Sequence, residues 1–138
     1  MVNVLSMVKK SLLSFLLSTT IVFSFPIHAE QQFISPDLAF IPTISGNKVS
    51  IKIASGTYLY KNKISVIDSR TNKQLNIKFT NNPILKKFPN IDAPQKLFLS
   101  KADFIVSVPS KTTIQIIYQG CSAQGLCYPP QRKILKVE

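Results

Sequence analysis

The chain has 138 residues and carries 17 lysines and arginines against 6 aspartates and glutamates, a formal net charge of +11. Its length allows one domain and hardly leaves room for a second. The one histidine, His28, falls in a predicted leader, which excludes Ser-His-Asp and Cys-His catalysis in the mature protein. The two cysteines supply only half of the ligands that tetrahedral zinc needs. We therefore expect no metal and no cofactor, and any chemistry must come from carboxylates, hydroxyls or the two sulfurs.

The N-terminal segment has the pattern of a secretory signal peptide. Lys9 and Lys10 precede an apolar stretch of about 15 residues, roughly 22 Å long as a helix, which is shorter than the ~30 Å hydrocarbon core of a bilayer. The small residue Ala29 marks a plausible cleavage site. We predict a signal peptide at residues 1–29 and a mature domain at residues 30–138, with an uncleaved membrane anchor as the alternative. Export implies the periplasm, where cysteines can pair.

Apolar residues then recur with a period of two, which is typical of strands that bury one face. The clearest alternation lies at residues 48–53. Further candidates lie at residues 58–60, 64–66, 75–79, 104–108, 114–118 and 133–137. No window sustains a helical stripe, and turn-forming residues separate the segments. About six to eight short strands at this spacing predict an all-β fold, either an antiparallel immunoglobulin-like β-sandwich or a small barrel.

Residues 81–94 interrupt the alternation. They contain three prolines and the cluster Lys86-Lys87-Phe88. A segment of this length without a strand pattern predicts a loop that is long enough to have a function. The best helical window follows it at residues 95–102, but this window is short and comes directly after a proline.

Both cysteines lie in one segment, residues 118–130, with five residues between Cys121 and Cys127. Gly125 among those five suits a hairpin-like connection, which can bring the Cα atoms within the ~4.4–6.8 Å of a disulfide. So small a ring restricts the unfolded chain by only about 2.4 kcal/mol, against ~4.7 kcal/mol for a 100-residue loop. Spacing alone therefore leaves two interpretations open, a structural bridge and a redox centre.

The cysteine segment closely resembles the Y-Q-G-C-x-x-x-G-x-C-Y-P-P motif of a known family, the N-terminal periplasmic domain of the thiol:disulfide interchange protein DsbD. Residues 33–40 are similar to that family's opening F-x-x-x-x-x-A-F segment, and residues 56–64 are similar to its G-Y-Y-L-Y-x-x-x-I strand. The resemblance covers nearly all of the predicted mature chain. It implies an immunoglobulin-like sandwich whose cysteine pair carries electrons.

Carried over by position, the resemblance implies that Cys127 forms mixed disulfides with partners and that Cys121 resolves them. The chemistry is thiol–disulfide exchange, in which a thiolate attacks a partner sulfur along the axis of its disulfide. No histidine is expected in the mature chain to lower the pKa of a thiolate, so we expect the docked partner to supply part of the activation.

The resemblance also implies aromatic surroundings for the sulfurs. Phe88 corresponds to the aromatic residue of a cap loop, although its lysine neighbours differ from the acidic Phe-Tyr-Gly context usual in the family; the alternative is an ordinary loop anchor. Tyr58 and Tyr60 correspond to tyrosines near the sulfurs, or else are plain strand aromatics. Tyr128, beside Cys127, is expected to fix the exit of the strand rather than to react.

An electron relay follows from the family. Its members accept reducing equivalents from a thioredoxin-like domain of the same protein and pass them to thioredoxin-fold periplasmic proteins, including disulfide isomerases and proteins of cytochrome c maturation. No membrane bundle and no C-x-x-C domain follows in this sequence, so we expect a protein-disulfide reductase type of activity with a separate membrane or thioredoxin-like electron donor. The alternative from another class is an immunoglobulin-like binding or adaptor module whose disulfide is purely structural.

The basic charge does not indicate a nucleic-acid partner. The lysines are spread over polar strand positions such as Lys48, Lys52 and Lys78, and no RNA-binding motif or helix-turn-helix is visible. We expect a solvated basic face that steers acidic redox partners or is weakly attracted to anionic membrane surfaces.

Overall fold

The structure is a computed structural model that describes residues 21–25 and 33–138. The chain divides into two units, Met1–Gln32 and Phe33–Glu138, and the strands all belong to the second. Most of the predicted signal peptide lies outside the described residues, so the leader and its cleavage site stay predictions. Within the described ranges, no helix is both long and apolar enough to cross a membrane.

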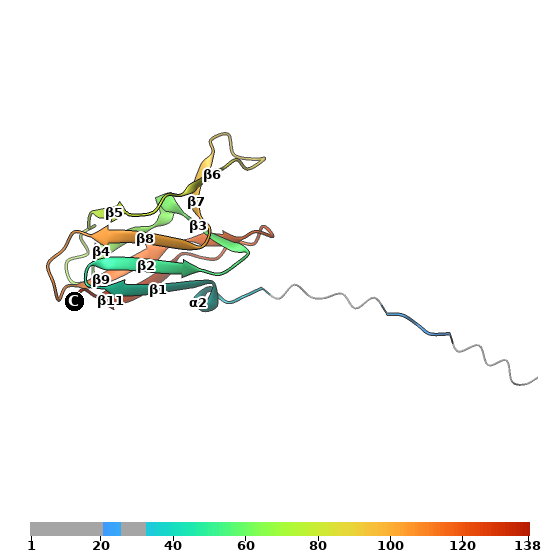
Figure 1. Cartoon of the computed structure of the whole chain (residues 1–138), viewed down its shortest axis with the longest axis horizontal. Coiled ribbons are helices and arrows are strands. Elements are labelled where there is room, and N and C mark those ends of the chain that lie inside the picture. Colours follow the sequence, from blue (N-terminus) through green and yellow to red (C-terminus); the bar gives the residue numbers. More distant parts are fainter. Residues whose placement is uncertain (1–20, 26–32) are drawn as a thin grey trace, which may run out of the picture. The chain divides into compact units, whose positions relative to one another are not determined.

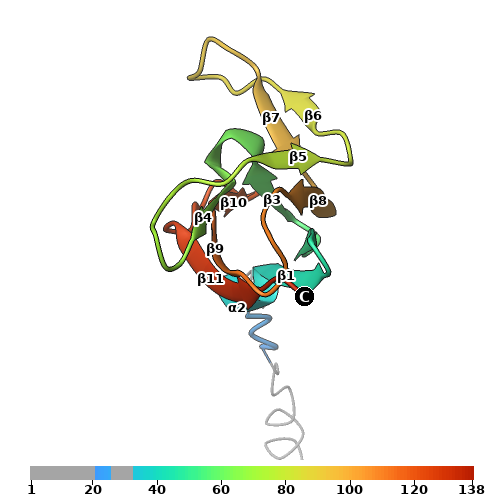
Figure 2. The same cartoon turned by 90° about the vertical axis from the view of Figure 1, so that its left-hand side faces the viewer.

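The unit Phe33–Glu138 is built from antiparallel strands in three sheets (Figures 1 and 2). The first sheet has the order β1 (Phe40–Ser45), β2 (Lys48–Ile53), β8 (Lys101–Val106), β5 (Ile77–Phe79). The second, called here the cysteine sheet, has the order β10 (Gly120–Ser122), β3 (Thr57–Tyr60), β7 (Gln95–Phe98), β6 (Ile84–Lys86). The third has the order β11 (Gln131–Lys136), β9 (Thr113–Tyr118), β4 (Ser65–Asp68). Two short helices, α2 (Pro36–Ala39) and the 3-10 helix η1 (Lys61–Lys63), precede β1 and follow β3.

The main core comes from the same alternation that the sequence displays. In β2 the side chains of Val49 and Ile51 are buried, whereas those of Lys48 and Lys52 are exposed. β8 and β9 bury every second residue in the same way. The buried side chains of these strands join one cluster that includes Phe40, and each large apolar side chain in it contributes roughly 1.5–3 kcal/mol through its removal from water.

The all-β antiparallel prediction is confirmed, and the sheets are open rather than closed into a barrel. The described residues contain eleven strands where about six to eight were expected. Of the additional strands, β1, β6 and β10 lie at sheet edges, and β7 has only four residues. β1 is such an edge strand and contains Pro42, a residue that sheets tolerate mainly at an edge.

The predicted loop at residues 81–94 contains strand β6, which pairs with β7. The resulting hairpin, residues 84–98, is called here the arm, and both views show it extending from the rest of the sheets (Figures 1 and 2). The arm is the part of the cysteine sheet beyond β3, to which β7 is paired. The loop between β6 and β7 carries Phe88, the predicted cap residue.

Candidate functional site

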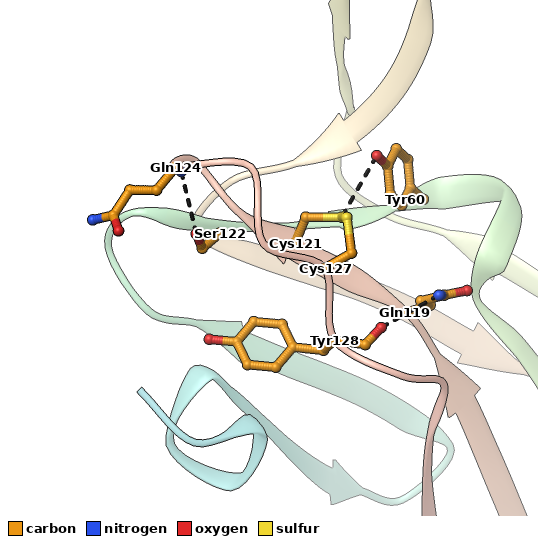
Figure 3. Close-up of a disulfide and its surroundings, with 7 residues drawn as sticks. All are labelled: Tyr60, Gln119, Cys121, Ser122, Gln124, Cys127 and Tyr128. Atoms are coloured by element: carbon orange, nitrogen blue, oxygen red, sulfur yellow. Dashed lines mark hydrogen bonds between the residues drawn. A yellow bond between two sulfur atoms is a disulfide. The ribbon is translucent and has the colours of Figure 1, made fainter. Parts of the chain in front are cut away.

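Cys121 and Cys127 form a disulfide at the end of the cysteine sheet (Figure 3). The two residues face each other across an antiparallel bridge. The N–H groups of Ser122 and Tyr128, which follow the cysteines, donate to the carbonyls that precede the opposite cysteine, at 2.7 and 3.0 Å. The cysteines are therefore the narrow, non-hydrogen-bonded pair of this bridge, which explains why their Cα atoms lie 3.9 Å apart, closer than the spacing had predicted.

The turn between the cysteines has its own hydrogen bonds. Gly125 adopts a φ of +96°, which a residue with a side chain rarely adopts, and its N–H donates to the Ser122 carbonyl at 3.0 Å. The Ser122 hydroxyl accepts the N–H of Gln124 at 3.2 Å. Ala123 donates its N–H to the Gly56 carbonyl at 2.8 Å, which ties the turn to the connection between β2 and β3.

The close approach of β10 to β3 requires glycine at position 120. A Cβ added there would clash with the carbonyl oxygen of Tyr58 and lie 2.8 Å from the ring of Phe40. The first contact is with backbone, which cannot move aside without breaking the strand pair. Gly120 therefore fixes the register in which Cys121 lies opposite Tyr58.

The two cysteines differ in access to solvent. Cys121 is only 1 % exposed, whereas Cys127 is exposed at the surface. Thiol–disulfide exchange needs an approach to sulfur along the disulfide axis, so access decides which sulfur a protein partner reaches first. In this geometry that residue is Cys127.

Three aromatic side chains, those of Tyr58, Tyr60 and Phe88, lie around Cys121. Cys121, Tyr58 and Leu97 form a small buried cluster, separate from the main core, against which Tyr60 and Phe88 pack. The hydroxyl of Tyr60 donates a hydrogen bond to Cys121 Sγ at 3.7 Å (Figure 3). Leu97 was not among the predicted site residues, and alternation does not mark it, because its neighbour Phe98 is buried as well.

Phe88 reaches this cluster from the loop of the arm. Its ring centroid lies 6.1 Å from that of Tyr58. The ammonium of Lys86 lies 5.4 Å from the centroid of the Phe88 ring, within the range of a cation–π contact. One of the lysine neighbours that differ from the family pattern thus contacts the Phe88 ring itself.

Tyr58 stays neutral at physiological pH. Burial, reinforced by the neighbouring Tyr60 hydroxyl, raises the pKa of Tyr58 to about 12. The ring of Tyr60 stands edge-on to it, with 5.5 Å between the centroids. The side chains that form the cluster with Cys121 are therefore uncharged and largely apolar.

Tyr128 serves the main core rather than the sulfurs. Its ring stacks on Phe33, with centroids 4.6 Å apart, and stands edge-on to Phe40 at 5.3 Å. Its hydroxyl donates to the carbonyl of Ile34 at 2.7 Å. Figure 3 shows its ring directed away from the disulfide. This packing agrees with the expectation that Tyr128 fixes the chain after Cys127.

The family of N-terminal domains of the thiol:disulfide interchange protein DsbD matches residues 30–138. The chain belongs to this family. DsbD of Colwellia psychrerythraea is 33% identical to it over 96 residues, which are 65% of this chain and 15% of that protein. The chain therefore spans less than a fifth of the length of this relative.

Two solved structures of DsbD N-terminal domains share the fold. The reduced form from Neisseria meningitidis has a TM-score of 0.63 and 23% identity, and the match covers 77% of this chain and 90% of that chain. The second structure, a complex between the DsbD N-terminal and the PilB N-terminal domains of Neisseria meningitidis, has a TM-score of 0.62 and 23% identity, with 77% and 88% covered. The predicted immunoglobulin-like sandwich is confirmed.

Among residues 21–25 and 33–138, no group of three or more His, Cys, Asp or Glu side chains lies close enough together to hold a metal ion. Asp103 of this DsbD-family domain pairs with Lys101 at 3.0 Å and accepts the Ser50 hydroxyl at 2.6 Å.

Proposed function

We propose that the domain passes reducing equivalents to thioredoxin-fold partners by thiol–disulfide exchange through Cys127 and Cys121. The observation that carries the proposal is the asymmetry of the pair, since an exposed Cys127 is bonded to a buried Cys121. A purely structural bridge has no need for one accessible sulfur. Membership of the DsbD N-terminal family supports the same activity.

The exchange takes two steps. In the reduced domain, the Cys127 thiolate attacks one sulfur of a partner's disulfide; the partner's S–S bond breaks, and its second sulfur leaves and takes up a proton. The Cys121 thiolate then attacks Cys127 Sγ, which restores the Cys121–Cys127 bond and expels the partner's first sulfur. Two electrons have moved to the partner, and the two thiols of the domain have become a disulfide.

The surroundings of Cys121 suit the second step. A hydroxyl donor such as Tyr60, 3.7 Å from Cys121 Sγ, stabilises negative charge on that sulfur when the bond opens. Phe88, Tyr58 and Leu97 exclude water and small thiols from the same sulfur. Phe88 in this view is a cap over the resolving cysteine, and the exposed Cys127 is left for partners.

The partner and the compartment follow from the same proposal. A DsbD N-terminal domain of Neisseria meningitidis forms a complex with a PilB N-terminal domain. We infer that this chain acts in the periplasm after export by its predicted signal peptide, on thioredoxin-fold proteins such as disulfide isomerases or proteins of cytochrome c maturation. A separate membrane or thioredoxin-like protein would return it to the dithiol state.

Trapping tests the proposal. With Cys121→Ala, the second step is blocked, so mixed disulfides through Cys127 accumulate with oxidised thioredoxin-fold proteins and are seen by non-reducing electrophoresis. The matched control is Cys127→Ala, which leaves only the buried Cys121 and traps little. Equal trapping by both variants, or none by either, contradicts the assigned roles. A reduction potential below about −300 mV for the wild-type pair would indicate a structural bridge instead.

A further inference from the structure

A hollow of about 520 Å³ lies between the arm and the disulfide turn. It is called here the arm groove. Ile84 and Leu97 from the arm and Leu99 just beyond it line one side, and Tyr58 and Ala123 line the other. Its volume falls within the ~300–1,000 Å³ of sites that bind small molecules, which is room for a few side chains of a partner.

The arm groove is continuous with the proposed redox site. Tyr58, which lines it, is paired with Cys121 in the cysteine sheet. Ala123, which also lines it, belongs to the turn that carries Cys127. Leu126, directly before Cys127, is 55% exposed. A chain segment that enters the groove therefore lies beside the turn that presents the reactive sulfur.

The groove leaves large apolar side chains in solvent. Ile84 is 43% exposed and Leu99 is 49% exposed. Single exposed apolar residues are ordinary, but two such side chains that line one hollow next to a reactive group form a surface suited to contact with another molecule. Burial of these side chains by a partner is favourable because it removes apolar surface from water.

The charge of the groove indicates which polar group a partner segment should carry. Among the described residues that line it, Lys86 alone is charged. The adjoining arm residues Lys87 and Lys96 are also basic, against the single acid Asp92 within residues 84–98. A carboxylate is the group that complements this arrangement.

We propose that the arm groove docks a segment of the partner protein that carries a large apolar side chain next to a carboxylate, and that this contact selects which disulfides reach Cys127. The proposal rests on the proposed exchange function. Docking would also act on the cap, since a carboxylate bound to Lys86 competes with the Phe88 ring for the same ammonium group.

Peptide substrates test the proposal on the reduced full-length chain. Three peptides of equal length carry one cysteine as a mixed disulfide with thionitrobenzoate, followed by Leu-Asp, Leu-Ser or Leu-Lys. Cys127 attacks the peptide sulfur and releases thionitrobenzoate; Cys121 then releases the peptide thiol. We expect the Leu-Asp peptide to react about three- to tenfold faster than the Leu-Lys peptide at low salt, with the difference shrinking at high salt.

Variants separate the groove from the chemistry. Lys86→Gln should abolish the preference for aspartate among the three peptides. Leu99→Ser should slow all three peptides about three- to tenfold, while its rate with the small neutral substrate 2-hydroxyethyl disulfide stays unchanged. The matched controls lie on β11, where Lys133→Gln and Ile134→Ser change an exposed cation and a 61% exposed apolar side chain and should alter no rate.

The following results would contradict the proposal that the groove docks a partner segment. Equal rates for the three peptides, or equal effects of Leu99→Ser and Ile134→Ser, overturn it while exchange through Cys127 stands. Binding to vesicles with anionic lipids that Leu99→Ser removes, without any change in the peptide rates, assigns the groove to lipid instead. A reduced chain that reacts with no disulfide at all overturns both this inference and the proposed function.

Discussion

The main core and the small cluster around Cys121 are both built by alternating strands, yet they exclude water in different ways. In the main core, side chains from several strands, such as Ile51, Phe104 and Ile116, cover one another. Around Cys121, only Tyr58 and Leu97 are equally buried, and side chains from a loop and a strand end, Phe88 and Tyr60, complete the cover. Since a loop contact opens at lower free energy than a sheet-on-sheet core, access to the sulfurs can change while the fold stays intact.

The largest effect on stability is expected in the main core. Phe104 is 1% exposed and stacks edge-on against Phe79 with centroids 5.6 Å apart. Phe104→Ala should lower the free energy of unfolding by about 3–5 kcal/mol, through lost burial and a residual cavity. Urea denaturation of the oxidised protein measures it. If Phe104→Ala lowered the free energy of unfolding by less than about 1 kcal/mol, the main core would tolerate a lost side chain as well as the cluster around Cys121 does, and the two regions would not differ.

Gly120→Ala tests the place where the two regions meet. The added methyl group would meet the Tyr58 carbonyl on one side and the Phe40 ring of the main core on the other. We expect a loss of about 1–3 kcal/mol, because β10 has to shift from β3. The control is Gly46→Ala, whose Cβ meets nothing within 4 Å and which costs only the strain of its φ of +60°. Similar losses in urea denaturation for both variants would show that strand contact at Gly120 is unimportant.

Alkaline pH probes the cluster around Cys121 separately. The pKa of Tyr58 rises from its ordinary value of 10.0 to about 12 in the folded protein, so the folded state retains a proton that the unfolded state loses. This contribution to stability is complete below pH 10 and is lost as the pH rises toward 12; it amounts to about 1–2 kcal/mol.

The measurement is the difference in unfolding free energy between wild type and Tyr58→Phe across pH 9–11.5. The comparison with the variant is needed because burial also raises the pKa values of Tyr118 and Tyr128 in the main core. If the two proteins show the same pH dependence, the Tyr58 hydroxyl titrates as it would in water.

The smallest effect on stability, below about 1 kcal/mol, is expected for Phe88→Ala, because this half-buried ring lies on a loop. Its effect on chemistry should be larger, with a several-fold faster reduction of the Cys121–Cys127 bond by dithiothreitol. Ile91→Ala, at a 41% exposed residue of the same loop, is the control. A rate unchanged by Phe88→Ala would make this ring an ordinary loop anchor rather than a cap.

The strands of the main core could be predicted from the sequence more completely than the strands around Cys121. The strand at Lys48–Ile53 could be predicted from strict alternation, because one of its faces is buried and the other is open to solvent. The pairing of Cys121 with Cys127 follows from short spacing and a glycine turn. The edge strands β6 and β10 could not be predicted from alternation, because β6 is exposed and β10 is buried at every residue.

Long-range pairing decides the rest of the site. Whether Cys121 or Cys127 is buried depends on the register of β10 against β3, which places Cys121 opposite Tyr58. The arm groove exists because β6 pairs with β7, so that Ile84 lies opposite Leu97. Neither of these two strand registers can be predicted from a local sequence pattern. Only the family resemblance indicated the roles of the two cysteines and of Phe88.

The backbone hydrogen bonds that flank the disulfide have a consequence for the lifetime of partner complexes. The bonds donated by Ser122 and Tyr128 hold the two cysteines opposite each other without help from the sulfurs. Groups positioned in this way react at effective concentrations far above those of free solutes. We therefore expect Cys121 to resolve a mixed disulfide on Cys127 soon after it forms. The complex with a partner should be short-lived, and turnover should be limited by encounter rather than by release.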